Sequence, residues 1–202
     1  WAVLVIDVQP CFVEAEEGAL PVPGTDKAYV NKVKRDTKWF HQKGYMILGS
    51  RDYHPEDHVS FSTHEPAGPW PPHCVQTAGD SRALVDNNLF FELVKKGQDP
   101  LFDSYSAFKD DGGAETELHA ILQAQGIQNL IIYGIATDYC VYYSVLDAIT
   151  LGYNVIVVED LNRGVAQGTT ADAIADMTAK GAEFVARAKA AHKRALELSE
   201  DI

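Results

Sequence analysis

The feature that most constrains the fold of this chain is an alternation of short apolar runs with longer amphipathic segments. Each apolar run is rich in β-branched residues and has the length of a single strand. The segments between the runs carry apolar residues three and four positions apart, as the buried face of a helix does. Parallel strands joined by crossover helices produce this rhythm. We therefore expect an α/β fold: a single-domain, open, doubly wound sheet that is mostly parallel, with about six strands and with helices on both faces.

The positions of the expected elements follow from these patterns. Strands are expected at residues 2–7, 46–50, 91–94, 130–133 and 154–158, with a weaker sixth at 183–185. Helices are expected at residues 26–43, 114–124, 139–151 and 170–180. Gly126 and Gly152 closely follow two of these helices, as helix C-termini favour. Thr169 and Thr170 offer a cap for the last helix.

Chain length and composition favour one domain. With 202 residues and 46% hydrophobic residues the chain can bury one core, so we expect a single domain over residues 1–202. Its last part, about 186–202, spaces Lys and Arg along Ala and Leu, which predicts a solvated amphipathic helical tail. The alternative is that this tail docks on a partner chain, so a homo-oligomer remains open.

The charge of the chain narrows the choice of partners. A formal net charge of −12 and a pI near 4.9 argue against nucleic acid or an anionic membrane as partner and favour a small neutral or cationic ligand. No apolar run reaches the roughly 20 residues that cross a bilayer, and the start lacks the basic flank of a signal peptide. We expect a soluble intracellular protein, located in the cytoplasm. A targeting segment before Trp1 remains open.

Two polar and aromatic stretches interrupt the alternation. Residues 51–80 and 96–113 are long for connections inside a compact domain, and loops of that length are usually functional. Both leave from the carboxyl ends of expected strands, which is where open α/β sheets bind their ligands.

Three residues whose side chains can take part in acid–base or nucleophilic chemistry lie at or just after the ends of separate expected strands. Asp7 ends the first strand and can act as a general base; the alternative is a capping or loop aspartate. Lys96 follows the third strand and can hold a thiolate or carboxylate charged; the alternative is a solvated flank. Cys140 lies at the start of an expected helix after the fourth strand. The fold would bring all three together.

Cys140 is the expected nucleophile among the three cysteines. The N–H groups at a helix start lower a thiol pKa and offer donors to an oxyanion; the alternative is a buried cysteine that only packs. Cys11 and Cys74 fit that packing role better, since neither opens an expected helix. An odd and sparse set of cysteines differs from the paired framework of a secreted domain, so at least one thiol should be free.

A metal site is expected within the first long stretch. Asp52 and His54, separated by one residue, point to the same side of an extended backbone, and His73 follows some twenty residues later. One carboxylate and two imidazoles suit one divalent ion, with Zn favoured and Fe or Mn as alternatives. His58 and His64 are additional candidates. The alternative is that all are surface histidines of a loop.

Six segments, taken in order, resemble the isochorismatase-like cysteine hydrolases and, within them, the nicotinamidases. The resemblance runs from residue 2 to about 185. The matching segments are Val5-Ile6-Asp7-Val8-Gln9, Arg51-Asp52-Tyr53-His54-Pro55, Trp70-Pro71-Pro72-His73-Cys74-Val75, Lys96-Gly97, Asp103-Ser104-Tyr105-Ser106-Ala107-Phe108 and Gly134-Ile135-Ala136-Thr137-Asp138-Tyr139-Cys140-Val141.

The resemblance implies an amidase that hydrolyses nicotinamide to nicotinate and ammonia through a cysteine thioester, as a step of NAD salvage. The site residues that it implies are a catalytic triad of Asp7, Lys96 and Cys140, an oxyanion hole from the N–H groups of Ala136 and Cys140, the metal ligands Asp52, His54 and His73, and a cis Ile135–Ala136 peptide. Phe12, Trp70 and Tyr105 lie in or beside matching segments and would line a pocket for a flat ring; the alternative is core packing.

The chain departs from the family pattern at one place, and other functions remain open. Pro10-Cys11-Phe12 stands where the family commonly has Asn-Asp-Phe. A further hypothesis is that Cys11 lies near Cys140 and that oxidation links the two and silences the enzyme. The rival functions are an amidase for a carbamoyl or ureido substrate, a vinyl-ether hydrolase without a nucleophilic cysteine, and a catalytically silent binding module. The sequence does not decide the metal, the oligomeric state or activity on pyrazinamide-like analogues.

Overall fold

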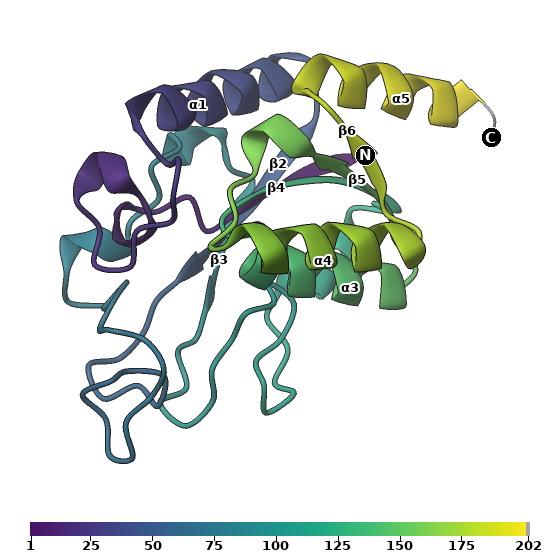
Figure 1. Cartoon of the computed structure of the whole chain (residues 1–202). Coiled ribbons are helices and arrows are strands. Elements are labelled where there is room, and N and C mark those ends of the chain that lie inside the picture. The colour runs from purple at the N-terminus through teal and green to yellow at the C-terminus, as the bar shows by residue number, and fades with distance from the viewer. Residues whose placement is uncertain (201–202) are drawn as a thin grey trace.

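Six parallel strands form one open sheet in the order β3-β2-β1-β4-β5-β6 (Figure 1). The computed structural model describes residues 1–200. The strands are β1 (Ala2–Ile6), β2 (Met46–Asp52), β3 (Glu92–Lys96), β4 (Asn129–Gly134), β5 (Asn154–Val158) and β6 (Glu183–Val185). All six expected strands are present, and the expected fold class, a single-domain open doubly wound sheet, is confirmed.

Helices cover both faces of the sheet because successive strand residues point to opposite sides. In β1, Val3 and Val5 pack into one hydrophobic cluster, and Leu4 packs into the other. The first cluster lies under α1 (Lys27–Gln42) and α5 (Ala188–Glu200), which share one side of the molecule (Figure 1). The second lies under the other three helices, α2 (Leu118–Ala124), α3 (Tyr142–Thr150) and α4 (Gln167–Ala179).

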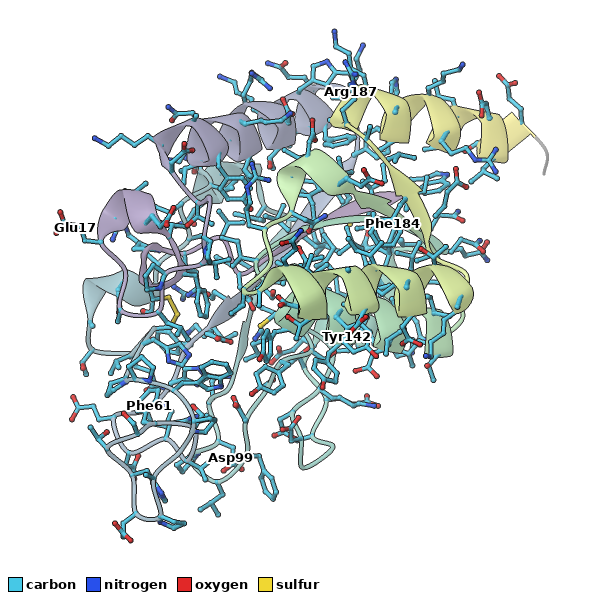
Figure 2. All side chains as sticks on the ribbon, viewed as in Figure 1. Glu17, Phe61, Asp99, Tyr142, Phe184 and Arg187 are labelled. Atoms are coloured by element: carbon cyan, nitrogen blue, oxygen red, sulfur yellow. A yellow bond between two sulfur atoms is a disulfide. The ribbon has the colours of Figure 1, made fainter. Side chains whose placement is uncertain are left out.

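The strand order reverses between β1 and β4, and this switch point positions the site. Ile6 pairs with Ser50 of β2 and with Gly134 of β4, so the central strands end level with one another. The long loops extend beyond this edge: Figure 2 shows Phe61 and Asp99 in them, on the side of the molecule opposite Arg187. A crevice at such a switch point is the usual ligand site of this fold class.

Several element boundaries differ from the expected ones. β2 continues to Asp52 and β3 to Lys96, because these two residues still pair across the ladder. The helix expected from residue 114 begins at Leu118, whose N–H donates to Thr116 Oγ1. The expected cap at Thr169 and Thr170 is wrong. The α4 helix begins at Gln167, and the distant Asp138 carboxylate accepts the preceding backbone N–H groups.

The C-terminal tail forms the expected helix, but the expectation that it is solvated is wrong for one face. Ala188, Ala191 and Ala195 of α5 are buried in the cluster shared with α1. At the edge of that contact, Tyr45 Oη lies 2.8 Å from Nδ1 of His192. The tail therefore belongs to the core of the domain as far as Glu200, the last residue described. Among residues 1–200, no helix combines the length and apolarity needed to cross a bilayer.

The cysteines differ most from the sequence expectation. Cys11 and Cys74 form a disulfide, with their Cα atoms 5.4 Å apart. The expectation that both are unpaired packing residues is therefore wrong, and so is the proposed link between Cys11 and Cys140. Cys140 is a free, buried thiol, as expected.

Candidate active site

The three strand-end residues converge on one buried ammonium group. Lys96 Nζ lies 2.9 Å from Asp7 Oδ2 and 3.5 Å from Cys140 Sγ. It also donates to Asp52 Oδ1 and, over 2.6 Å, to the Ser104 carbonyl. Asp7 is fully buried and Lys96 almost so. The fold therefore assembles a carboxylate, an ammonium and a thiol at hydrogen-bonding range in a site that excludes bulk water.

The backbone after β1 fixes the direction of Asp7. Its φ of +47° lies in the left-handed region, which non-glycine residues rarely adopt. The Asp7 N–H continues the ladder by donating to the Ser50 carbonyl over 3.2 Å. The Ser50 hydroxyl donates to Asp7 Oδ1 over 2.7 Å. Oδ1 is thereby engaged, and Oδ2 is left to face Lys96.

Burial and the neighbouring charges shift the pKa of each group. Burial raises the pKa of Asp7 against the opposing attraction of Lys96. At Lys96 burial acts downward, but Asp52 and Asp7 outweigh it and raise the pKa well above its ordinary value. Burial also raises the pKa of the Cys140 thiol well above its ordinary value, with Lys96 opposing and Asp7 adding to the rise. The expected lowering of this pKa by a helix start is therefore wrong for the resting thiol, which needs a base.

The segment before Cys140 makes a tight turn that opens toward the pocket. The Ile135–Ala136 peptide is cis, as the family resemblance implied. Thr137–Val141 then forms a π-helical turn that leads into α3. Among residues 1–200, the Ala136 N–H donates to no acceptor, so it is available to a ligand. Asp138 anchors this turn by accepting from the Val165 N–H over 2.9 Å.

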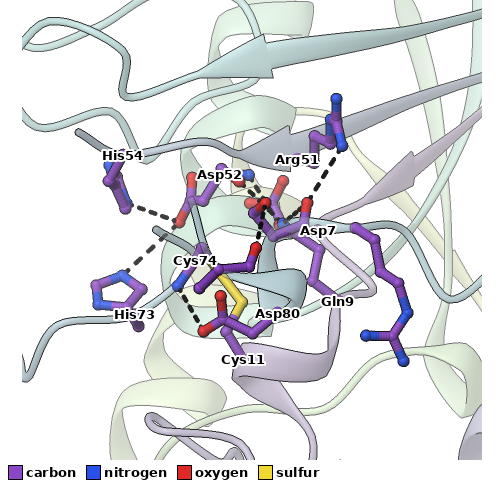
Figure 3. Close-up of a disulfide and its surroundings, with 12 residues drawn as sticks. Asp7, Gln9, Cys11, Arg51, Asp52, His54, His73, Cys74 and Asp80 are labelled. Carbon is purple, nitrogen blue, oxygen red and sulfur yellow. Dashed lines mark hydrogen bonds and ion pairs between the residues drawn. A yellow bond between two sulfur atoms is a disulfide. The ribbon is translucent and has the colours of Figure 1, made fainter. Parts of the chain in front are cut away.

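A second cluster, next to the first, has the geometry of a metal site. Asp52 Oδ2 lies 3.4 Å from His54 Nε2 and 3.9 Å from His73 Nε2. Figure 3 shows both imidazoles directed at the Asp52 carboxylate. The three ligand atoms lie within 4.8 Å of one another. Asp52 thus joins the two clusters, because its Oδ1 faces Lys96 and its Oδ2 faces the imidazoles.

The backbone holds the outer nitrogen of each imidazole. His54 Nδ1 lies 2.9 Å from the Gly97 carbonyl, and His73 Nδ1 lies 2.7 Å from the Pro71 carbonyl. Such contacts turn each Nε2 lone pair toward a shared ion. The buried Nε2 of His54 makes no hydrogen bond to the described residues, which fits a metal ligand. Gly97 is required here, since a Cβ would overlap the His54 ring and its φ is +64°.

The charge states of this cluster also suit a cation. Burial opposes ionisation of Asp52, but the charges of Lys96 and His54 outweigh it and hold its pKa below the ordinary value. Burial lowers the pKa of His73, which keeps it neutral. At His54 burial acts downward and is outweighed by Asp52, so its pKa is raised and a metal would compete with a proton there.

The two additional histidines occupy other places. The His58 ring lies 4.1 Å from the His54 ring, and its nitrogens are bonded to Ser60 Oγ and the Phe102 carbonyl. Burial lowers the pKa of His58 to about 4, so it is neutral. With His54 and Asp103 it forms a further group of possible ligand atoms. Among residues 1–200, the ring of the half-buried His64 is hydrogen-bonded to the Pro66 carbonyl alone.

A pocket at the switch point opens onto both clusters. It is lined by Phe12, Leu20, Pro21, Val22, Asp52, Trp70, His73, Asp103, Tyr105, Ile135, Ala136, Tyr139, Cys140 and Val165. The aromatic residues expected from sequence, Phe12, Trp70 and Tyr105, are therefore all at its wall. Trp70 Nε1 donates to Tyr105 Oη over 3.0 Å, and the ring of Phe12 lies 5.4 Å from that of His73.

The comparisons with known proteins agree with this geometry. Residues 1–189 match the family model described as the isochorismatase domain. The chain belongs to the isochorismatase family. It is 38% identical to the nicotinamidase of Escherichia coli (strain K12) over 199 residues, which span 90% of this chain and 92% of that enzyme.

Two solved isochorismatase-like structures resemble this one closely. The zinc complex of the pyrazinamidase from Pyrococcus horikoshii has 34% sequence identity and a TM-score of 0.82, with 92% of this chain and 98% of that chain covered. The nicotinate complex of PnC1 from L. infantum has 30% identity and a TM-score of 0.84, covering 92% and 91% of the two chains.

Within this isochorismatase-family domain, some residues at the site were not expected from sequence. Tyr139 lines the pocket and precedes Cys140, so its position in the motif was an available signal. Residues 20–22 and Val165 reach the pocket from loops whose sequences carry no such signal. The buried Gln9 side chain connects the backbone of Asp52 with that of Ser81. Its Oε1 accepts from the Asp52 N–H, and its Nε2 donates to the Asp52 and Ser81 carbonyls.

Proposed function

We propose that this isochorismatase-family protein is a nicotinamidase that hydrolyses nicotinamide to nicotinate and ammonia. The observation that carries the proposal is that one pocket is lined both by Cys140 and by the candidate metal ligands Asp52 and His73. Such a pocket suits a flat ring with a metal-binding nitrogen and a carboxamide. The E. coli relative bears the name of this activity, and the L. infantum structure contains its acid product.

We assign the chemistry to a triad of Asp7, Lys96 and Cys140. Asp7 takes the proton of the Cys140 thiol, and the thiolate attacks the carboxamide carbon. Asp7 returns that proton to the leaving nitrogen, ammonia departs, and a thioester on Cys140 remains. A water molecule, activated by Asp7, hydrolyses the thioester to the carboxylate. The raised pKa of Asp7 makes it a stronger base, and the raised pKa of the Cys140 thiol means that the nucleophile needs such a base.

The remaining residues around the triad have supporting roles. Lys96, 3.5 Å from the sulfur, stabilises the negative charge that forms on Cys140. The N–H groups of Ala136 and Cys140 form the proposed oxyanion hole for the tetrahedral intermediate. The free N–H of Ala136 supports this role.

Asp52, His54 and His73 are the proposed ligands of one divalent metal ion. The neutral His73 and the ionised Asp52 fit a hard or borderline cation, and zinc is favoured because the P. horikoshii relative contains it. A bound ion would supply a Lewis acid for the pyridine nitrogen of the substrate. Iron and manganese accept the same ligand set.

Phe12, Trp70 and Tyr105 are the proposed contacts of the pyridine ring. They are aromatic residues on the pocket wall, and the hydrogen bond from Trp70 to Tyr105 orients both rings. A pocket lined by aromatic and apolar side chains, with Asp52 and His73 also on its wall, favours an aromatic carboxamide over an extended ureido chain.

We place the reaction in NAD salvage, inside the cell and in the cytoplasm. The Cys11–Cys74 disulfide is an opposing observation, because such bonds persist mainly in oxidising compartments. Fractionation of cells that express the natural gene decides the location: a cytoplasmic enzyme stays with the soluble intracellular fraction after osmotic shock.

The proposal is tested by substrate choice and metal dependence together. Purified enzyme is assayed for ammonia release from nicotinamide and from a ureido amide, before chelation, after chelation, and after zinc is restored. We expect turnover of nicotinamide that chelation lowers and zinc restores, with little turnover of the ureido amide. Preference for the ureido amide would move the protein to the other amidase branch. No turnover of either amide after zinc is restored would support a silent binding module.

A further inference from the structure

The Cys11–Cys74 disulfide connects two segments that carry pocket residues. Cys74 directly follows the candidate metal ligand His73, and Cys11 directly precedes Phe12, whose ring contacts that of His73. Both cysteines are fully buried. Figure 3 shows the bond beside the metal cluster. Nothing in the proposed reaction uses these two sulfur atoms, so the bond has a different role.

His73 lies in a segment with little regular structure of its own. Between β2 and β3, from 53 to 91, the segment forms two short 3₁₀ turns and two isolated parallel β-bridges, His54 with Val75 and Phe61 with Trp70. Cys74 has a φ of +48°, a left-handed conformation that costs energy for a residue with a Cβ and persists only where its surroundings enforce it. The backbone bonds at Cys74 are few: its carbonyl accepts the His54 N–H over 3.1 Å, and its N–H donates to Asp80 Oδ2 over 3.2 Å.

Cys11, in contrast, is anchored to the sheet. It lies in the 3₁₀ turn Pro10–Phe12, and the Phe12 N–H donates to the Gln9 carbonyl over 3.2 Å. The Gln9 side chain clasps the backbone of Asp52, with both hydrogen bonds shorter than 3.0 Å. Cys11 is therefore held in register with Asp52, the candidate ligand that comes from a strand.

We propose that the Cys11–Cys74 disulfide is a positioning device for His73, which fixes this loop ligand relative to Asp52 and so sets the affinity of the site for its metal. The proposal rests on the metal site of the proposed function. The chain of contacts runs from Asp52 through Gln9 and Cys11 to Cys74, and it ends at the residue next to His73. The triad meets this chain of contacts at Asp52, whose Oδ1 faces Lys96, but strand ends and the turn before α3 hold Asp7, Lys96 and Cys140 themselves.

A redox dependence of metal binding follows. A phosphine reductant supplies two electrons to the disulfide and is oxidised, with one water, to the phosphine oxide, while each sulfur takes up a proton as a thiol. On reoxidation, dioxygen takes two electrons and two protons from the two thiols and becomes hydrogen peroxide, while the disulfide bond forms again. The reduced protein keeps the triad and loses the fixed position of His73.

The test compares zinc dissociation constants, measured by competition with a chromogenic chelator. The proteins are wild type, the double variant Cys11→Ala with Cys74→Ala, and a control, Phe40→Leu. Phe40 is a buried residue of α1 whose ring packs on Tyr133 of the sheet, and it is not part of the pocket. Cys140 is the only free thiol in wild type and the only cysteine in the double variant, so its alkylation rate by iodoacetamide reports on the triad in both.

We expect the double variant to bind zinc roughly 10–100-fold more weakly, which is the usual effect of losing a group that orients a metal ligand. The visible spectrum of bound Co²⁺ should change, while the alkylation rate of Cys140 stays within about twofold. The control should bind zinc as wild type does. A folded double variant with wild-type zinc affinity would overturn the proposal, and so would an equal loss in Phe40→Leu, which would indicate a general effect of destabilisation.

Two further measurements keep the outcome decisive. If the double variant does not fold, wild type refolded with the phosphine replaces it: its affinity should fall and should recover on reoxidation, and unchanged affinity contradicts the proposal. His73→Ala separates the two proposals. Wild type that binds no zinc, or binds it independently of His73, removes the metal site from the proposed function together with this inference. Zinc binding that depends on His73 but not on the disulfide removes this inference alone.

Discussion

Asp7 and Lys96 are positioned in the site in a different way from His73. The first two stand at or just after the ends of strands β1 and β3, where the parallel ladder fixes their positions. His73 stands in the long segment between β2 and β3, and its position depends on a backbone carbonyl, a left-handed neighbour and a disulfide. Asp7 and Lys96 are thus positioned by the sheet, whereas His73 is positioned by local interactions within a loop.

This difference predicts how substitutions near the strand-end residues and near the loop ligand affect the site. Residues at or just after the ends of paired strands are held by the ladder, so a substitution there alters charge more than geometry. A loop ligand such as His73 can shift when one of the bonds that hold its loop is lost, so a change outside the metal site can lower metal affinity. The strand-end residues and the loop ligand meet at Asp52, and substitutions on either side should therefore separate cleanly in their effects on chemistry and on metal binding.

The largest expected effect comes from Lys96→Met. The substitution leaves Asp7 and Asp52 buried without their shared cation, which should lower the free energy of unfolding by about 3–5 kcal/mol. We expect kcat to fall at least about 10³-fold, because the thiolate loses its electrostatic partner. Urea unfolding and steady-state kinetics measure the two effects.

The matched control is Lys95→Met, one residue earlier. Lys95 is exposed and lies over the Tyr53 ring, with Nζ 4.7 Å from the centroid. Its loss should change the free energy of unfolding by less than about 1 kcal/mol and leave kcat unaltered. Equal losses in both variants would show that the ammonium at Lys96 has no special role.

His73→Ala should have the next largest effect and should act on the metal. We expect the zinc dissociation constant to rise at least about 100-fold, and kcat/KM for nicotinamide to fall roughly 10–100-fold at limiting zinc. The alkylation rate of Cys140 should stay near that of wild type, since the triad does not depend on this loop. Chelator competition, kinetics and iodoacetamide labelling give the three values.

His64→Ala serves as the control for His73→Ala. His64 lies on the same loop, and its ring is hydrogen-bonded to the Pro66 carbonyl. Zinc binding and turnover should be those of wild type. A large loss of zinc affinity in this variant, or none in His73→Ala, would mean that the metal cluster is drawn from other residues.

Ser50→Ala should have the smallest effect, and it should appear in the pH profile. The Ser50 hydroxyl stabilises the ionised form of Asp7, so its loss should raise the pKa of that carboxylate further above the ordinary value of 3.8. Because the reaction needs ionised Asp7, activity is present above this pKa and is lost as pH falls through it. The acidic limb of kcat/KM should therefore move to higher pH, with only a several-fold loss at the optimum. An acidic limb that stays in place or moves to lower pH would contradict the assignment of Asp7 as base.

The parts of the fold that depend on local pattern were predictable from the sequence. The five long apolar runs and the weak run at 183–185 all became strands, because alternation and β-branching are local properties. The fold class then placed Asp7, Lys96 and Cys140 at one edge before any coordinates were considered, since the carboxyl ends of parallel strands share that edge. Asp52 and His54 were predictable from a different local pattern, because two residues separated by one position point to the same side of an extended backbone.

The remaining features depend on contacts between distant segments. The Asp138 carboxylate holds the approach to α4 from far away in sequence, so the local threonines were mistaken for the cap. The disulfide joins cysteines separated by 63 positions, a pairing that spacing cannot reveal. Burial reverses the expected shift of the Cys140 pKa, because the sequence shows the helix start but not the carboxylates around the thiol.

Ammonia release from nicotinamide by zinc-loaded wild type and Cys140→Ala is the most direct test of the account. Both proteins are first shown to be folded and to bind zinc with the same dissociation constant, so that only the nucleophile differs. The account predicts steady turnover by wild type and a loss of at least about 10⁴-fold in the variant, since a missing nucleophile leaves only binding and electrostatic stabilisation. Turnover by Cys140→Ala above about one hundredth of the wild-type rate would contradict the thioester mechanism at its centre.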